Sequence, residues 1–531
     1  MIVQTLVKPG EYRDSVALML LARELGNLPG VGNVSVVMGT PANRALLVQA
    51  GLLTPAAEHA TPNDLVIAVQ ARDAATAAAA CRQAEQLLAA QATGAVSSTS
   101  GALRPRSLRT AVRALPQANV AVISVPGPYA AAPAWDALRA GLHVLLFSDH
   151  VSIEDEIALK EYARDHGLFL MGPGAGTAIM NGIGLGFANA VPRGPVGIVA
   201  AAGTGLQEVS ALLAQAGSGI TQGIGTGGRD VSEQVGGIMM LEGLKALQAD
   251  SDTRVILVVS KLPSPAVADK ILAQVRQSDK PTVLALMRAQ ERIQNSEFRI
   301  LNSNLELSNL LTAFDLREAA ALAAALARGE DVKNVYKQLA AEDRKLHLKA
   351  NSLRRPLNAR QRYIRGLYSG GTLCEEAMRI WQAELGEVWS NAPLDLRYKL
   401  PDSAKSKRHT AIDLGEEEFT LGRPHPMIDN TLRIQHLFRE ARDPSVGVIV
   451  LDVVLGYGAH PDPAAELGPA IAQAREYAGQ QGRFLNVVLS ITGTEDDPQN
   501  RTRQAKAFKQ AGAVIAPSNA AAARLASWIV K

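Results

Sequence analysis

The chain of 531 residues is long enough for about three to four domains of ordinary size. Its net charge of +3 gives no global case for a nucleic-acid or membrane partner, and no apolar run approaches the roughly 18 residues of a membrane helix. The two cysteines, Cys81 and Cys374, form no disulfide framework, and the N-terminus lacks a signal-peptide pattern, so we expect a cytoplasmic protein.

Residues 1–90 alternate between apolar strand patterns and amphipathic helix patterns, which predicts a small α+β domain. Within it, Thr40 followed by Pro41 predicts the start of a helix. Residues 91–117 are small, polar and basic, as in a linker. The alternation resumes in residues 118–194 and predicts half of a doubly wound sheet, with Gly- and Pro-rich loops after its first and last strands.

The next domain, residues 195–328, begins with the stretch VGIVAAAGTGLQEVSAL. A buried strand over 196–200, a tight glycine turn and a helix start are predicted, and the spacing of Thr204 and Gln207 fits a capping box. Such a helix start presents N–H groups and a positive dipole end to an anion. The anion-binding residues predicted here are Gly203, Thr204 and Gly205.

The same series recurs in residues 366–531, after a helical, basic linker over 329–365. Its turn is Gly370, Gly371 and Thr372, and Thr372 with Glu375 repeats the capping-box spacing. Each turn is followed by Thr-x-Gly-Arg, by an amphipathic helix and by two apolar strands, at similar spacing. Two copies of a four-part series indicate a duplicated α/β domain.

Several motifs of the chain resemble the subunits of succinyl-CoA synthetase and related NDP-forming acyl-CoA ligases. They include VPGPYAA, MGPGAGTAIMNG, GIVAAAGTGLQE and IGTGGRD in the first half and LYSGGTL in the second. Over nearly the whole chain, and most specifically at GRPHPMID, the sequence is similar to the FdrA family. The resemblance implies an α/β fold: a truncated Rossmann-like CoA-binding-type domain, two flavodoxin-like domains and the small N-terminal α+β domain.

The chain departs from the ligases in ways that bear on its activity. It has no histidine between His166 and His347, where the ligases carry the phosphate on a histidine, and no ATP-grasp domain is visible. The FdrA resemblance implies instead an oxamate carbamoyltransferase subunit in allantoin breakdown, which converts oxalurate and phosphate to oxamate and carbamoyl phosphate. It also implies partner subunits, an oligomer, small anionic substrates and phosphate. No cofactor is assigned with certainty, and CoA is kept as a candidate.

The candidate site follows from the two turns and from the motifs after them. Gly228 and Gly422 complete the proposed phosphate cradle, and Arg229, Arg423 and His425 are the candidate catalytic residues. The arginines would bind substrate carbonyls, or else form ion pairs with neighbours such as Asp230. His425, set between two prolines, would polarise the carbamoyl group or move a proton, or else be structural.

Other side chains near the turns carry weaker expectations. Asp413 and Asp452 end strands and would orient the site or cap turns. Cys374 lies near a helix start, which would lower its thiol pKa, although carbamoyl transfer needs no thiol. Glu416 to Glu418 are typical of a solvated acidic turn, and no metal-ligand cluster has usable spacing.

Two other functions stay open from sequence. One is an acid–CoA ligase that takes its nucleotide-binding parts from another chain, and the missing histidine argues against it. The other is a non-catalytic scaffold or regulatory subunit, which would have no need of two Gly-Thr turns.

Overall fold

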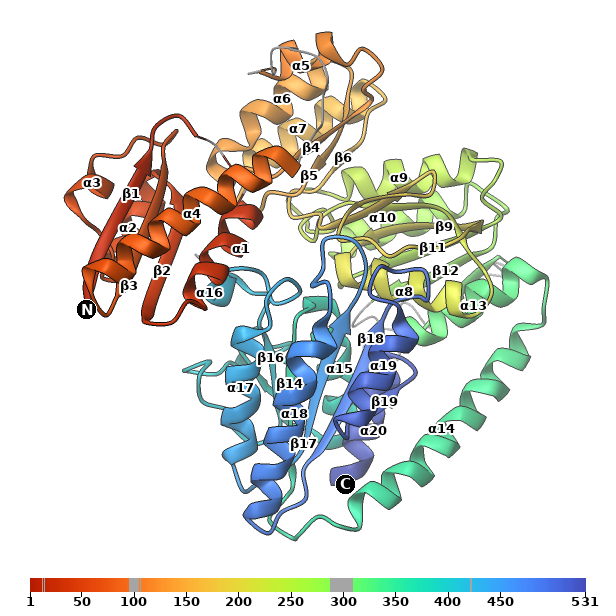
Figure 1. Ribbon diagram of the computed structural model, residues 1–531. Coiled ribbons are helices and arrows are strands. Elements are labelled where there is room, and N and C mark those ends of the chain that lie inside the picture. Colours follow the sequence, from red (N-terminus) through yellow and green to blue (C-terminus); the bar gives the residue numbers. More distant parts are fainter. Residues whose placement is uncertain (12, 14, 95–104, 106, 287–308, 421–422) are drawn as a thin grey trace. The chain divides into compact units, whose positions relative to one another are not determined.

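A computed structural model describes the chain except for residues 12, 14, 95–104, 106, 287–308 and 421–422 (Figure 1). It divides into two compact units, which are described separately. The first unit contains Met1–Ala114 and the short segment Glu418–Pro424; the second contains Leu115–Glu417 and His425–Lys531.

The first unit is built on a three-stranded antiparallel sheet in the order β1-β3-β2. Its strands are β1 (Ile2–Lys8), β2 (Val31–Met38) and β3 (Leu65–Ala71). Its helices are α1 (Ser15–Gly26), α2 (Pro41–Gln49), α3 (Pro55–Glu58), α4 (Ala74–Gly94) and α5 (Leu108–Ala114). The central strand β3 is almost wholly buried because apolar clusters pack on both faces of the sheet. The predicted cap is confirmed: the Thr40 hydroxyl accepts the Asn43 N–H at the start of α2, with Pro41 at the first helical position.

The second unit begins with a small parallel sheet in the order β4-β5-β6. Its elements are β4 (Val120–Ile123), the 3-10 turn η1 (Gly127–Tyr129), α6 (Ala131–Arg139), β5 (His143–Leu146), α7 (Ile153–Asp165) and β6 (Leu170–Met171). A hairpin that the sequence pattern did not predict follows, β7 (Thr177–Met180) and β8 (Ile183–Gly186). Through β7 this hairpin joins the edge of the next sheet.

That next sheet has seven strands in the order β13-β12-β11-β9-β10-β7-β8. Its remaining strands are β9 (Arg193–Ala201), β10 (Ile220–Gly225), β11 (Val255–Ser260), β12 (Thr282–Leu286) and β13 (Leu310–Thr312), all parallel to one another. The helices that follow these strands are α8 (Gly203–Gln215), α9 (Ile238–Ala249), α10 (Pro265–Val275) and α13 (Leu316–Arg328). Strands β11 and β12 are buried along their whole length, as parallel strands covered on both faces should be.

The long helix α14 (Val332–Arg354) leads to a six-stranded parallel sheet in the order β15-β16-β14-β17-β18-β19. Its strands are β14 (Tyr363–Tyr368), β15 (Trp389–Ser390), β16 (Thr410–Asp413), β17 (Val446–Val454), β18 (Asn486–Thr492) and β19 (Val514–Ala516). Its helical elements are α15 (Gly371–Leu385), η2 (Leu396–Tyr398), α17 (Thr431–Arg442), α18 (Pro463–Gln480), α19 (Arg501–Gln510) and α20 (Asn519–Val530). The short helix α16 (Glu417–Thr420) belongs, except for Glu417, to the segment Glu418–Pro424 of the first unit.

The two large sheets share one topology, which confirms the predicted flavodoxin-like repeat. Numbered along each copy, the five parallel strands that match run in the order 2-1-3-4-5: β10-β9-β11-β12-β13 in the first and β16-β14-β17-β18-β19 in the second. Ligands of such sheets bind at the carboxyl ends of the strands, beside the point where the order reverses. In both copies that point lies between the first and third strands, where α8 and α15 begin.

Candidate functional site

The helices α8 and α15 begin without side-chain caps. Their N-cap residues are Ala202 and Gly370, and neither end receives a side-chain hydrogen bond. The predicted capping boxes at Thr204 and Thr372 are therefore wrong: each N-cap lies two residues earlier, which makes each threonine the second residue of its helix. The correction favours an anion, because a first turn that no side chain caps presents its N–H groups and the positive end of the dipole.

The two turns lie against each other. A Cβ placed on Gly370 would be 2.7 Å from Thr204 Cγ2 and 2.9 Å from Thr204 Oγ1. In the reverse direction, a Cβ on Gly205 would be 3.0 Å from Thr372 Cγ2. Both threonines are buried, at 7% and 3% exposure. The structure thus brings together the two glycine-rich turns that the sequence placed 168 residues apart, counting from Thr204 to Thr372.

Asp452, in the third strand of the second repeat, holds the turn before α15. Its carboxylate accepts the backbone N–H groups of Ser369 at 2.8 Å and Gly370 at 2.9 Å, and the Ser369 hydroxyl at 3.0 Å. The buried guanidinium of Arg433 pairs with Asp452 at 3.0 Å and balances its charge. Asp452 is therefore a turn-capping residue, one of the two roles expected for it.

Asp413, the last residue of β16, lies directly beside the first residue of α15. One carboxylate oxygen, Oδ1, accepts the Gly415 N–H at 2.9 Å. The other, Oδ2, would be 2.7 Å from a Cβ on Gly371, so a larger residue there would have to displace the carboxylate. Within the described residues Oδ2 has no hydrogen-bond partner. Burial, together with the charges of Glu416 and Asp452, raises the pKa of Asp413 to about 7.

His425 contacts the same loop. Its Nδ1 accepts the Met427 N–H at 3.2 Å, and its Nε2 would be 3.0 Å from a Cβ on Gly415. Burial and the nearby Arg433 lower the pKa of His425 to about 4, so the ring is neutral at pH 7 and carries its proton on Nε2. A neutral ring donates a hydrogen bond without acting as an acid.

Lys261, which follows β11, is a cation that the sequence reasoning missed. Its charge acts on Asp413 and lowers the carboxyl pKa against the raising effect of burial. Among the described residues its ammonium group has no hydrogen-bond or ion-pair partner. A lysine directly after the third strand of a flavodoxin-like repeat was the available sequence signal, because that strand end borders the ligand-binding edge.

The other residues predicted for the site are not shown in contact with the paired helix starts. Gly228 lies beside the end of β9, since a Cβ placed on it would be 4.0 Å from Ala201 O. Arg229 forms the alternative ion pair, although with Glu156 of α7 at 2.8 Å in place of Asp230, and also donates to Val151 O. Arg423 is exposed and belongs to the segment described with the first unit. Gly422 lies outside the described residues.

Cys374 corrects another expectation. The thiol is buried in α15, and burial raises its pKa well above the ordinary value, with Asp413 and Asp452 adding to the effect. The helix start does not make it a thiolate. Glu416, Glu417 and Glu418 are exposed, as expected.

Two buried glutamates join the repeats by reciprocal capping. Glu208 of α8 accepts the Asn519 N–H at 3.0 Å, at the first residue of α20 in the other repeat. Glu376 of α15 accepts the Leu316 N–H at 2.8 Å, at the first residue of α13. Each glutamate lies five residues after the first residue of its helix, so the signal was present in the sequence as GTGLQE and GTLCEE. Burial raises the pKa of both carboxyls.

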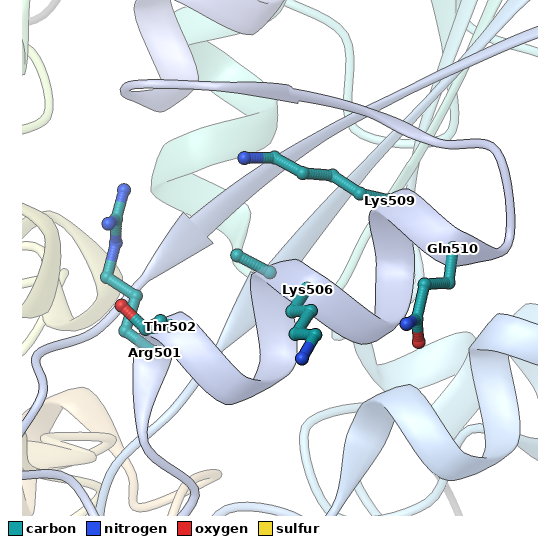
Figure 2. Close-up of a pocket in the computed structure, with 6 residues that line it drawn as sticks. Arg501, Thr502, Lys506, Lys509 and Gln510 are labelled. Carbon is teal, nitrogen blue, oxygen red and sulfur yellow. The ribbon is translucent and has the colours of Figure 1, made fainter.

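An open hollow on α19 does not coincide with this site. It is lined by residues of that helix alone, and Lys506 and Lys509 extend in different directions from it (Figure 2). These cations form the surface of a basic helix face and do not converge on one point.

The loops of the small β4-β5-β6 sheet differ from what a diphosphate group would need. In the loops after β4, β5 and β6 (residues 124–130, 147–152 and 172–176) there is no lysine or arginine for a diphosphate. A Cβ on Gly127 would lie 1.9 Å from Asp149 O, so protein backbone fills that turn. No group of three or more His, Cys, Asp or Glu gathers for a metal in the described parts of the chain.

Three family models match the chain. The CoA-ligase model covers residues 367–529, the CoA-binding-domain model covers residues 193–285, and the model described as "AllF, heavy metal-associated domain" covers residues 1–104. The CoA-binding match thus falls on the first flavodoxin-like sheet, and the assignment of residues 118–194 to a partial Rossmann domain stays a prediction. No described helix is long and apolar enough to cross a membrane.

The chain is also similar to individual known proteins. The uncharacterized protein YahF of Escherichia coli (strain K12) is 40% identical over 98% of this chain and 97% of its own length. The α subunit of the ADP-forming succinate–CoA ligase of Methanothermobacter thermautotrophicus is 28% identical over 31% of this chain and 55% of that subunit. A solved acetyl-CoA synthetase of Ca. Korarchaeum cryptofilum, in complex with phosphate and ADP, aligns at 14% identity over 77% of this chain and 82% of its own, with a TM-score of 0.32.

The domain matches and the duplicated sheets define a CoA-ligase-like α/β protein with an AllF-type N-terminal domain. Within that class, the near-full-length similarity to YahF shows that the chain belongs to the FdrA family.

Proposed function

We propose that the chain is the catalytic subunit of a carbamoyltransferase that cleaves oxalurate with inorganic phosphate to give oxamate and carbamoyl phosphate. The observation that carries the proposal is the contact between two helix starts that no side chain caps, α8 at Gly203 and α15 at Gly371. A phosphate between them would receive backbone hydrogen bonds and the positive ends of two helix dipoles.

The side chains around the turns support transfer from a carbonyl donor. Lys261 would neutralise charge on phosphate or on the donor carboxylate. The neutral His425 would donate its Nε2 hydrogen to the carbamoyl oxygen as negative charge develops there. The Met427 N–H fixes the His425 ring before substrate arrives, which is what electrostatic stabilisation of a transition state requires.

The substrate class rests on family membership and on what the chain lacks. The first repeat has no histidine that could carry a phosphate, since no histidine lies between His166 and His347. Direct attack of phosphate on the donor needs no such relay. The AllF-type match favours a place in allantoin breakdown, and we propose that further subunits and oligomerisation complete the enzyme.

A second candidate is an acid–CoA ligase that obtains its nucleotide site from another chain. The matches to the CoA-ligase and CoA-binding models favour it. The absence of basic residues in the loops after β4, β5 and β6 speaks against it.

A phosphorolysis assay separates the two. The full chain, with its candidate partner subunits, receives oxalurate and phosphate, and carbamate kinase with ADP converts carbamoyl phosphate to ATP. We expect ATP from the wild type and at least about tenfold less from Thr204→Val, because the lost hydroxyl lies against Gly370, at the facing turn of the proposed phosphate site. Thr502→Val, on the exposed face of α19, is the matched control and should keep full activity. CoA- and nucleotide-dependent turnover of succinate, without carbamoyl phosphate, would overturn the proposal in favour of the ligase.

A further inference from the structure

Cleavage of a carbamoyl–nitrogen bond needs a proton at the departing nitrogen, and neither His425 nor Lys261, in the roles proposed above, provides one. The neutral His425 ring is a hydrogen-bond donor with little acidity, and Lys261 is assigned the role of neutralising charge on phosphate or on the donor carboxylate. Oxamate leaving as an amide anion would be a very poor leaving group. A third group must carry the proton.

Asp413 has the geometry for this task. Its side chain is 5% exposed, its Oδ1 is fixed by the Gly415 N–H, and its Oδ2 lies beside the first residue of α15. Oδ2 therefore borders the place where phosphate would sit, and no described donor occupies it. A carboxylate pointing at an anion site is unfavourable unless it is protonated when the anion is bound.

We propose that Asp413 is the proton relay between phosphate and the leaving nitrogen. This inference rests on the proposed carbamoyltransferase function. A phosphate oxygen attacks the carbamoyl carbon and forms the new C–O bond, while the bond from that carbon to the oxamate nitrogen breaks. The proton on Asp413 Oδ2 passes to that nitrogen, and the hydroxyl proton of the attacking hydrogen phosphate returns to Asp413. The sum is oxalurate plus hydrogen phosphate giving oxamate plus carbamoyl phosphate, with the carboxyl group restored.

The electrostatics of the pocket agree with the relay. Burial, then Glu416 and Asp452, raise the Asp413 pKa to about 7, while the Gly415 N–H and Lys261 oppose the rise. His425, which also approaches Gly415, is neutral at this pH. Near pH 7 the carboxyl group therefore exists in both forms, which suits a group that gives and regains a proton in one turnover.

The test compares two carbamoyl donors in the complete enzyme. Oxalurate needs a proton at its leaving nitrogen, whereas p-nitrophenyl carbamate releases a phenolate that needs none. We expect Asp413→Asn to lower kcat about 100-fold or more with oxalurate and phosphate, the usual size of general acid–base catalysis, and only slightly with the phenyl donor. Asp402→Asn, in an exposed loop of the same unit, should match the wild type with both donors.

A pH profile gives an independent readout. With oxalurate, wild-type kcat should fall as pH rises and Asp413 loses its proton. The residual kcat of Asp413→Asn should not show this fall, and Asp413→Glu should show it again. Phosphate affinity, measured by isothermal titration calorimetry, should be unchanged in Asp413→Asn, and this result would also show that the variant is folded.

An active wild type with an unchanged Asp413→Asn variant, or equal losses with both donors, overturns the relay alone. A wild type that forms no carbamoyl phosphate with all partner subunits overturns the carbamoyltransferase function as well.

Discussion

Substituting Gly370 by alanine should force the two helix starts apart. Gly370 has an ordinary extended backbone, with φ −115° and ψ 115°, so alanine introduces no backbone strain. The added Cβ would meet three atoms of Thr204 at 2.7 to 2.9 Å, closer than van der Waals contact allows. Overpacking of this kind costs about 1–3 kcal/mol, and the displacement also widens the proposed phosphate cradle.

The matched control is Gly203→Ala in the facing turn. The nearest atom to its new Cβ is Thr177 Oγ1 at 3.9 Å, so this alanine fits without displacement. Scanning calorimetry should show a lower transition temperature for Gly370→Ala than for Gly203→Ala, and titration calorimetry should show weaker phosphate binding. Replacing Thr204 by glycine in the Gly370→Ala background removes all three contacts and should recover part of the loss, giving a favourable coupling energy. Equal transition temperatures for the two alanine variants would show that the turns do not touch.

Two further predictions concern buried charges. Burial raises the pKa of Glu376 from 4.5 to about 7, so its contribution to stability is present at low pH and is lost as pH rises through 7. Between pH 6 and pH 8 the free energy of unfolding should fall by about 1 kcal/mol. The thermal unfolding of Glu376→Gln should be less sensitive to pH over that range. A mutant that loses stability with pH as steeply as the wild type would contradict this role. Lys160 is fully buried and lies 2.8 Å from both Glu156 and Asp230, so it joins α7 to the loop before α9. Lys160→Met should lower the free energy of unfolding by about 3–5 kcal/mol, because two buried carboxylates lose their partner. Lys245→Met, at an exposed pair with Glu242, is the control and should change stability by less than about 1 kcal/mol; similar losses in both would argue against the buried network.

The duplicated architecture was predictable because its signals are local. Apolar strands followed by glycine turns occur twice in the same order, and both copies fold as flavodoxin-like sheets. The hairpin at 177–186 was not predicted, since an antiparallel pair added to a parallel sheet breaks the alternation of strand and helix. The helix starts were placed two residues late because threonine is a common N-cap, whereas glycine takes the first position in α8 and α15.

The candidate site was predictable only in part, for a physical reason. The paired turns could be inferred from the repeat and the family resemblance, but the groups around them are contributed by distant strands. Asp413 reaches α15 from β16, and Glu208 caps a helix 311 residues away. Arg229 forms its ion pair with Glu156 of α7, whereas Asp230 forms one with Lys160. Such choices depend on tertiary packing, which residue spacing does not encode.

The most direct test of the paired-helix phosphate site is a phosphate titration of two variants at one position. Gly203→Pro removes a single first-turn N–H, and proline is well tolerated at the first position of a helix; Gly203→Ala keeps that N–H. A hydrogen bond to a charged group contributes about 1.5–3 kcal/mol, so the proline variant should bind inorganic phosphate about tenfold or more weakly than the alanine variant, at similar thermal stability. Equal phosphate affinity in the two folded variants, measured by isothermal titration calorimetry on the full chain, would contradict a phosphate held by the start of α8.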